Sequence, residues 1–190
     1  INKHKTVLTN DVIWSPSSNI TKKGFMNTLQ GMIRNTNYQT RKTGEYKDEG
    51  TVNELNAVLT YKSSLPLKKE NINRSNFLSP NFMIRYSPGH MRNLSNEDVF
   101  LNYTNLFSMN KTAEIESGLS AILGFDFKIN EKINDQEEEK LSISLGQTFR
   151  LDENKDLPSK SSLDQKMSDV VGEIDYNFSE IGSIGYKFSV

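Results

Sequence analysis

The sequence of 190 residues contains no cysteine, which excludes a disulfide framework, a thiolate metal site and a cysteine nucleophile within it. It has only two histidines, His4 and His90. Neither stands at a spacing from acidic or serine residues that indicates a metal site or a catalytic triad. No apolar run approaches the ~18 residues that a membrane-spanning helix needs. We therefore expect no enzyme active site and no cofactor.

An excess of charge of one sign is also lacking, because 23 lysines and arginines face 24 aspartates and glutamates. A nucleic-acid-binding domain normally carries a basic patch or a high pI, so we expect no nucleic-acid partner. Only 35% of the residues are hydrophobic, which alone would permit a disordered chain. The net charge of −1 and the 18 aromatic residues (10 Phe, 7 Tyr and 1 Trp) argue instead for an ordered fold.

What the sequence does contain is an alternation of apolar and polar residues with a period of two. In 119–129 and 141–151, one set of alternate positions is almost wholly apolar and the other is mainly polar or glycine. This pattern is typical of strands with two chemically different faces. Weaker or noisier copies occupy 5–14, 25–34, 53–61, 82–86, 99–107, 169–178 and 184–190. The sequence predicts an all-β antiparallel up-and-down meander of about eight or nine strands.

Polar stretches separate these strands and are predicted to be connections. They are residues 37–50, 63–78, 130–140 and 152–168, with a tight turn at 179–183. The run Glu137–Glu139 is predicted to be a solvated loop, and Pro88-Gly89 a turn. Helical spacing of apolar residues from Leu163 to Val171 leaves a short helix there as an alternative.

The length of the best strands favours a membrane barrel over a soluble sandwich. A strand of 10–11 residues tilted by ~45° spans about 25 Å, the height of the apolar band of an outer-membrane barrel. Sandwich strands are commonly ~5–6 residues long. Alternation alone does not distinguish an apolar face turned toward lipid from one turned inward. A generic porin or receptor barrel, a barrel enzyme and a soluble β-sandwich binding module therefore remain alternatives.

Several short motifs, in order along the chain, carry a resemblance to a known family. They are Phe82–Gly89, Asn105–Lys111, Glu114–Gly118, Leu145–Arg150, Ser161–Leu163 and Lys166–Gly172. Together they resemble the barrel domain of the LptD (OstA) family of LPS-assembly outer-membrane proteins, in its alphaproteobacterial form. Lys111 stands where the family usually has arginine. The resemblance is strongest over residues 80–190.

The resemblance implies transport rather than catalysis. Such proteins assemble lipopolysaccharide into the outer leaflet of the Gram-negative cell outer membrane. The implied partners are lipopolysaccharide, an LptE-like plug lipoprotein, periplasmic Lpt bridge proteins and outer-membrane lipid. The family closes a barrel of about two dozen strands, within the known size range. Residues 1–190 are therefore expected to be a fragment of the barrel domain, an open curved sheet.

The alternation assigns side chains to the two faces of this partial transmembrane β-barrel. The residues predicted to face the lumen are Arg85, Asp126, Lys128, Arg150, Glu173, Asp175 and Lys187. The residues predicted to face lipid are Leu123, Phe125, Phe127, Leu145, Phe149, Tyr176 and Phe188. Arg85 and Arg150 could bind phosphate groups in a bidentate manner, or they could pair with carboxylates in the lumen.

Overall fold

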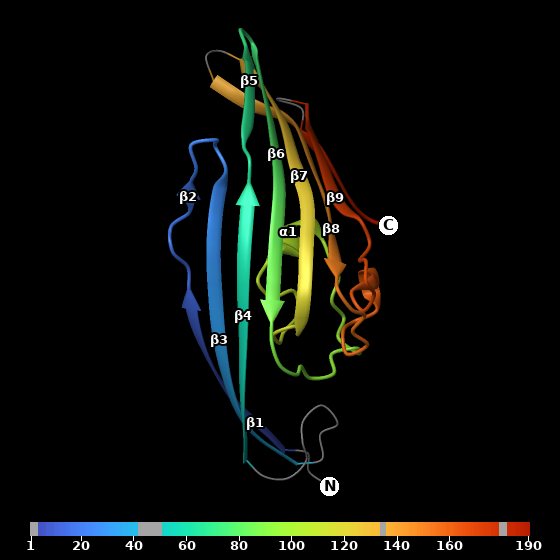
Figure 1. The fold of residues 1–190 in the computed structure, drawn as a ribbon. Helices are drawn as coiled ribbons and strands as arrows, with labels where there is room; N and C mark the ends of the chain where they lie inside the picture. Colours follow the sequence, from blue (N-terminus) through green and yellow to red (C-terminus); the bar gives the residue numbers. More distant parts are fainter. Residues whose placement is uncertain (1–3, 42–50, 134–135, 179–181) are drawn as a thin grey trace.

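The computed structural model describes residues 4–41, 51–133, 136–178 and 182–190. They form one antiparallel sheet of ten strands in the order β1-β3-β4-β6-β7-β8-β9-β10, with β2 paired to β3 and β5 paired to β6 (Figure 1). Because this order ends at β1 on one side and at β10 on the other, the sheet is open. The predicted all-β, antiparallel and open architecture is confirmed.

The elements have the following bounds. The strands are β1 (His4–Trp14), β2 (Asn19–Ile20), β3 (Met26–Arg41), β4 (Thr51–Ser64), β5 (Leu67–Asn71), β6 (Arg74–Ser87), β7 (Gly118–Ile133), β8 (Gln136–Arg150), β9 (Val171–Asn177) and β10 (Ser183–Ser189). The helical turns are α1 (Tyr103–Leu106) and η1 (Lys160–Ser162). No helix of the described residues is long and apolar enough to cross a membrane.

The strands are longer than predicted at three connections. Strand β3 continues to Arg41, while the rest of the predicted 37–50 connection lies outside the described residues. Glu137–Glu139 belongs to β8 rather than to a loop, and its carboxylates bond across the sheet, as in the 2.6 Å pair of Lys128 with Glu139. The predicted 63–78 connection contains β5 and the start of β6, which pair as a hairpin. The strands continue through these polar stretches because polar side chains pair across the sheet there, where apolar side chains pair elsewhere.

The prediction of a strand over 99–107 was wrong. This stretch contains α1, and Asn102 and Asn105 form a reciprocal capping box at its start. Such a box satisfies backbone N–H groups that a strand would present to a neighbour. At the predicted alternative helix over 163–171, the structure places irregular chain and the start of β9 instead. Part of the predicted turn at 179–183 lies outside the described residues.

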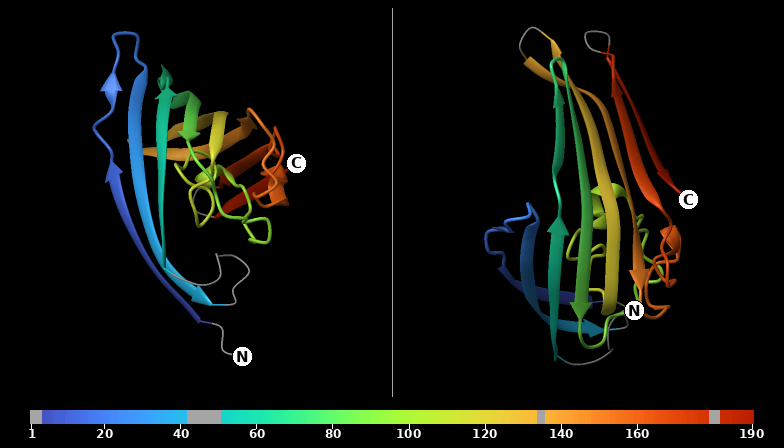
Figure 2. Two further views of the ribbon diagram at one scale, coloured as in Figure 1. Left: turned by 60° about the horizontal axis from the view of Figure 1, so that its bottom comes forward. Right: turned by 45° about the horizontal axis from the view of Figure 1, so that its top comes forward.

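The two faces of the sheet differ in what covers them. In the left view of Figure 2 the sheet bends around residues 88–117, which lie inside the curve. We call residues 88–117 the inner segment, the covered face the inner face, and the opposite one the outer face. Apolar side chains such as Leu59, Tyr86 and Leu123 stay about half exposed on the outer face. In most strands, alternation has therefore placed the main apolar stripe away from the inner segment.

Candidate functional site

The inner segment leaves and re-enters the sheet at neighbouring positions. It follows β6, which ends at Ser87, and it precedes β7, which begins at Gly118; these two residues are paired in the sheet. Gly89 and Gly118 adopt φ angles of +97° and +99°, a region that glycine enters without steric cost. The segment therefore begins and ends in sharp bends that turn it onto the inner face.

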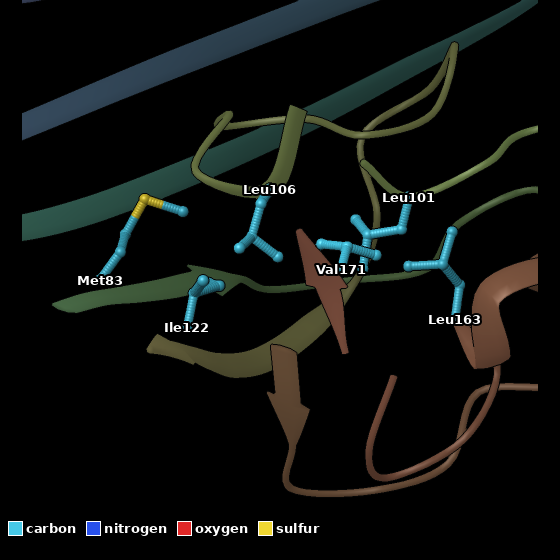
Figure 3. Packing of buried hydrophobic residues seen from close by; sticks show 6 residues of the cluster. All are labelled: Met83, Leu101, Leu106, Ile122, Leu163 and Val171. Atoms are coloured by element: carbon cyan, nitrogen blue, oxygen red, sulfur yellow. The ribbon is translucent and has the colours of Figure 1, made fainter. Parts of the chain in front are cut away.

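Apolar side chains hold the inner segment against the middle of the sheet. Leu101 and Leu106 of the segment are buried against residues of β6, β7 and β9 and of the 151–170 connection (Figure 3). The members of this apolar cluster are Met83, Leu101, Leu106, Ile122, Leu163 and Val171. Burying each such side chain contributes about 1.5–3 kcal/mol. The inner face is therefore partly a dry core rather than a uniformly polar surface.

Two glycines make room for α1. Gly124 and Gly146 are paired across β7 and β8. A Cβ atom at Gly146 would lie 2.4 Å from Cδ2 of Leu106, and one at Gly124 would lie 3.1 Å from Cζ of Phe107. The helix therefore rests almost directly on the backbone of the sheet, and this close approach requires glycine there.

A buried charge cluster lies beside the apolar cluster; its members are Arg85, Lys111, Glu116 and Arg150. Arg85 pairs with Ser120 across β6 and β7, and Ser120 pairs with Arg150 across β7 and β8, so the three form one row on the inner face. The inner segment supplies the other two charges. Arg150 Nη2 lies 2.5 Å from Glu116 Oε2, and the backbone N–H of Lys111 donates to Glu116 Oε1 at 2.7 Å.

The electrostatics of this cluster follow from its near-complete burial and from the three cations that surround one carboxylate. Burial alone would raise the pKa of Glu116, but the charges of Lys111, Arg85 and Arg150 lower it to about 2. The pKa of Lys111 is lowered to about 8; burial is the largest cause, Glu116 opposes it, and the charges of Arg85 and Arg150 add to the lowering. Glu116 therefore stays ionised, and the cluster carries an excess of positive charge.

Most of the donors in this cluster lack an acceptor. Arg85 donates from Nε to the carbonyl of Met109 at 2.6 Å. Among the described residues, the buried donors Arg85 Nη1, Arg85 Nη2, Lys111 Nζ, Ser120 Oγ and Arg150 Nε have no hydrogen-bond partner. Buried polar groups in proteins are nearly always paired, so each of these atoms calls for an explanation.

A second set of charges joins the inner segment to β1, β3 and β4, and we call it the rim network. Arg34 pairs with Asp11 at 2.8 Å and donates to the carbonyl of Ala113 at 2.7 Å. Arg92 pairs with Glu54 at 2.8 Å and with Glu114. The rim network consists of Asp11, Arg34, Glu54, Arg92 and Glu114, and all five side chains remain partly exposed.

The residues predicted to face the lumen all lie on the inner face. Arg85 and Arg150 enter the buried charge cluster, whereas Asp126 accepts bonds from Asn81 and Ser144 farther along β7. Outside that cluster, Lys128 pairs with Glu139 and Lys187 pairs with Glu173 at 2.8 Å. Asp175 shares the face of Glu173 on β9.

The residues predicted to face lipid all lie on the outer face. The register places them in continuous rows, such as Phe125 opposite Leu145 and Ala121 opposite Phe149. The members are Leu123, Phe125, Phe127, Leu145, Phe149, Tyr176 and Phe188. The faces are thus separated as the alternation indicates.

Sequence reasoning did not find that four motifs meet at one point. Arg85, Lys111, Glu116 and Arg150 each belong to a different motif, yet they converge in the buried charge cluster. The sequence did hold a signal for this cluster, because each of its four members is a charged residue within one of the motifs. Of the two roles weighed for the arginines, Arg150 has a carboxylate partner, whereas Arg85 has a backbone carbonyl.

Comparison with known proteins gives one finding about the whole chain. A family model described as LptD: LPS transport system D matches residues 14–188, nearly all of the sequence. A search of curated proteins finds no match. Among the described residues, no group of three or more acidic or histidine side chains could hold a metal ion.

Proposed function

The chain belongs to the LptD family, and from this premise we propose that it forms part of an outer-membrane β-barrel translocon. In this proposal residues 1–190 are one section of the barrel wall. The translocon assembles lipopolysaccharide into the outer leaflet of the outer membrane of a Gram-negative bacterium. The inner face lines the conduit, and the outer face contacts membrane lipid.

The observation that carries this proposal is the apolar band of the outer face and its polar borders. In β3 and β4 the outward apolar residues run from Leu29 to Ile33 and from Leu55 to Tyr61. Beyond one end lie Asn35, Asn37 and Asn53, which bond to one another at 2.6–3.3 Å. In β7 the outward apolar residues run from Leu119 to Ile129. At ~3.3 Å per residue these eleven positions extend about 36 Å along the strand, and a tilt of ~45° leaves about 25 Å of height, which matches the apolar band of outer-membrane barrels.

Asn27 marks the other border of the band in the same strands. Its side-chain oxygen accepts hydrogen bonds from Tyr61 at 3.0 Å and from Ser63 at 2.7 Å. A tyrosine whose ring belongs to the apolar band and whose hydroxyl bonds to a polar border has the placement of an interfacial aromatic residue. This polar border at Asn27 is evidence in favour of an outer face whose middle part contacts lipid.

The unpaired edges of the sheet favour the presence of further strands beside it in the proposed barrel. Strands β1 and β10 stand at the two ends of the strand order, so within the described part of the chain each has one side without a neighbour in the sheet. Unpaired backbone groups are too costly in hydrocarbon for an open sheet to remain there. In the proposed barrel, additional strands pair with β1 and β10 and close the wall.

Trp14 allows a direct test of the outer face. It is the single tryptophan of the sequence, it lies on β1, and 53% of it is exposed. We expect brominated lipids to quench its fluorescence after reconstitution of the closed barrel, in which any tryptophan outside residues 1–190 is replaced by phenylalanine. A W14F/L123W variant, with the tryptophan moved along the same face, should be quenched as well. The matched inner-face variant W14F/S142W should be quenched weakly. Equal quenching of both variants would contradict the assignment of the faces.

The cargo is tested by photocrosslinking in living cells. A photoreactive residue at Ser142 faces the inner side of β8, and one at the neighbouring Ile143 faces outward. We expect lipopolysaccharide adducts at position 142 if the molecule travels along the inner face. Position 143 reports the lipid around the barrel. Failure to crosslink lipopolysaccharide at 142 and at further inner positions of β7 and β9 would reject the conduit. The periplasmic bridge proteins and plug lipoprotein are further proposed partners.

A further inference from the structure

We propose that the buried charge cluster, together with Ser120, binds one small tetrahedral oxyanion of the phosphate class between the inner segment and strands β6–β8. The site does not depend on the proposed transport function. The bound anion fixes the inner segment to the sheet, because it supplies the hydrogen-bond acceptor that the cluster lacks.

The charge balance of the cluster supports an anion. Arg85 and Glu116 are completely buried, and Lys111 and Arg150 are less than a tenth exposed. The electrostatic neighbours of Lys111 are Glu116, Arg85 and Arg150, so three cations share one carboxylate. A buried charge without a partner costs several kcal/mol. A dianion would match the excess of two positive charges.

The unpaired donors supply the second argument. Arg85 contributes two guanidinium nitrogens, Lys111 its ammonium group, Ser120 its hydroxyl and Arg150 its Nε, and none has a partner among the described residues. Every one of these groups can donate a hydrogen bond. The register places Arg85, Ser120 and Arg150 side by side on adjacent strands. Arginine forks and a hydroxyl are the donors that bind the oxygens of a tetrahedral oxyanion.

The burial of the site favours a free inorganic anion as the ligand, rather than the phosphate headgroup of a lipid. Glu116 and the Met109 carbonyl, both from the inner segment, lie over the strand residues. A lipid phosphate could reach these groups only by lifting the segment, whereas inorganic phosphate or sulfate can be enclosed as it folds into place. The ligand chemistry is the same in both cases.

The test is equilibrium dialysis of the purified protein in detergent with radiolabelled inorganic phosphate at constant ionic strength. We expect one phosphate per chain, displaced by sulfate. Removing one charged donor group costs about 1.5–3 kcal/mol, so Arg85→Gln and Lys111→Gln should weaken binding about ten- to a hundredfold. Ser120→Ala should weaken it less and tests the site if a charge variant fails to fold. Lys187→Gln, which removes an exposed cation of the inner face, is the matched control.

Four results would decide whether the cluster binds an oxyanion. Phosphate retained by the wild type and by Lys187→Gln, but lost from the cluster variants, supports the site. Displacement of the labelled phosphate by phosphatidic acid in mixed micelles supports the same chemistry and identifies a headgroup as a source. No retention by the wild type, or equal retention by Arg85→Gln, overturns the proposal. A thermal midpoint of Arg85→Met above that of the wild type in phosphate would also overturn it, since removing an unneutralised buried cation is stabilising.

Discussion

The inner segment is attached to the sheet at two places, and the charged residues at these two places differ in their burial. On the side of β6–β8, the buried charge cluster is sealed from water and lies beside the apolar cluster. On the side of β1–β4, the rim network keeps its five charged side chains partly exposed and has carboxylates for both of its arginines. The second side also buries Ile115 of the inner segment against Met32 and Val58. We expect the first attachment to be more sensitive to the loss of a charge, because its charges are buried, and the second to be more tolerant. Four predictions separate them.

The largest effect is expected from Glu116→Gln. This change leaves three buried cations without their carboxylate, and breaking a buried ion pair typically costs about 3–5 kcal/mol. Denaturant unfolding in detergent measures the loss, and limited proteolysis reports release of the inner segment. Glu114→Gln, two residues away in the rim network, is the control and should cost about 1 kcal/mol. Equal losses would mean that the two attachments are alike.

Acid should act on the same carboxylate. The pKa of Glu116 is about 2 in the folded protein, below its ordinary value of 4.5. A carboxyl group with a lowered folded-state pKa adds stability above the ordinary pKa and loses it as the pH falls. We therefore expect Glu116 to cause a fall in stability between pH 4.5 and about pH 2. Unfolding curves of the wild type and Glu116→Gln should converge over this range. Parallel curves would contradict the prediction.

A smaller loss is expected from Gly146→Ala. The added Cβ would lie 2.4 Å from Leu106 and 2.8 Å from the carbonyl of Leu123, and overpacking of this kind typically costs about 1–3 kcal/mol. Gly31→Ala is the matched control, because its Cβ would meet its nearest atoms at 3.7 Å. Thermal unfolding followed by circular dichroism compares the two variants. Similar midpoints would show that α1 does not rest on the sheet as described.

The smallest effect is expected from salt. Exposed and partly exposed ion pairs contribute about 0–1 kcal/mol each and are screened by salt, whereas buried pairs are screened much less. Raising sodium chloride should therefore reduce the cost of Arg92→Gln and leave the cost of Glu116→Gln nearly unchanged. Denaturant midpoints of both variants at low and high salt provide the measurement. A salt dependence as strong at Glu116 as at Arg92 would remove the distinction between the attachments.

The sequence allowed the faces of the sheet to be predicted but not the attachment of the inner segment. Alternation is a local property, so the outward placement of Leu123 and Phe149 could be predicted from neighbouring residues. The meeting of Arg85 with Glu116 depends on how residues 88–117 fold back, which no local period encodes. The segment's own pattern, with Val99, Leu101 and Tyr103 at alternate positions, favoured a strand. Asparagine capping and packing on the inner face overrode it.

The pairing of Ser87 with Gly118 has a consequence for how this region can change. The two ends of a thirty-residue excursion meet on one rung of the ladder, so the excursion amounts to an oversized hairpin loop. Its length and content can vary without altering the register of the strands that it joins. We therefore expect the sheet to form without the inner segment. A short turn that joins residues 87 and 118 should leave the β6–β7 hairpin in place.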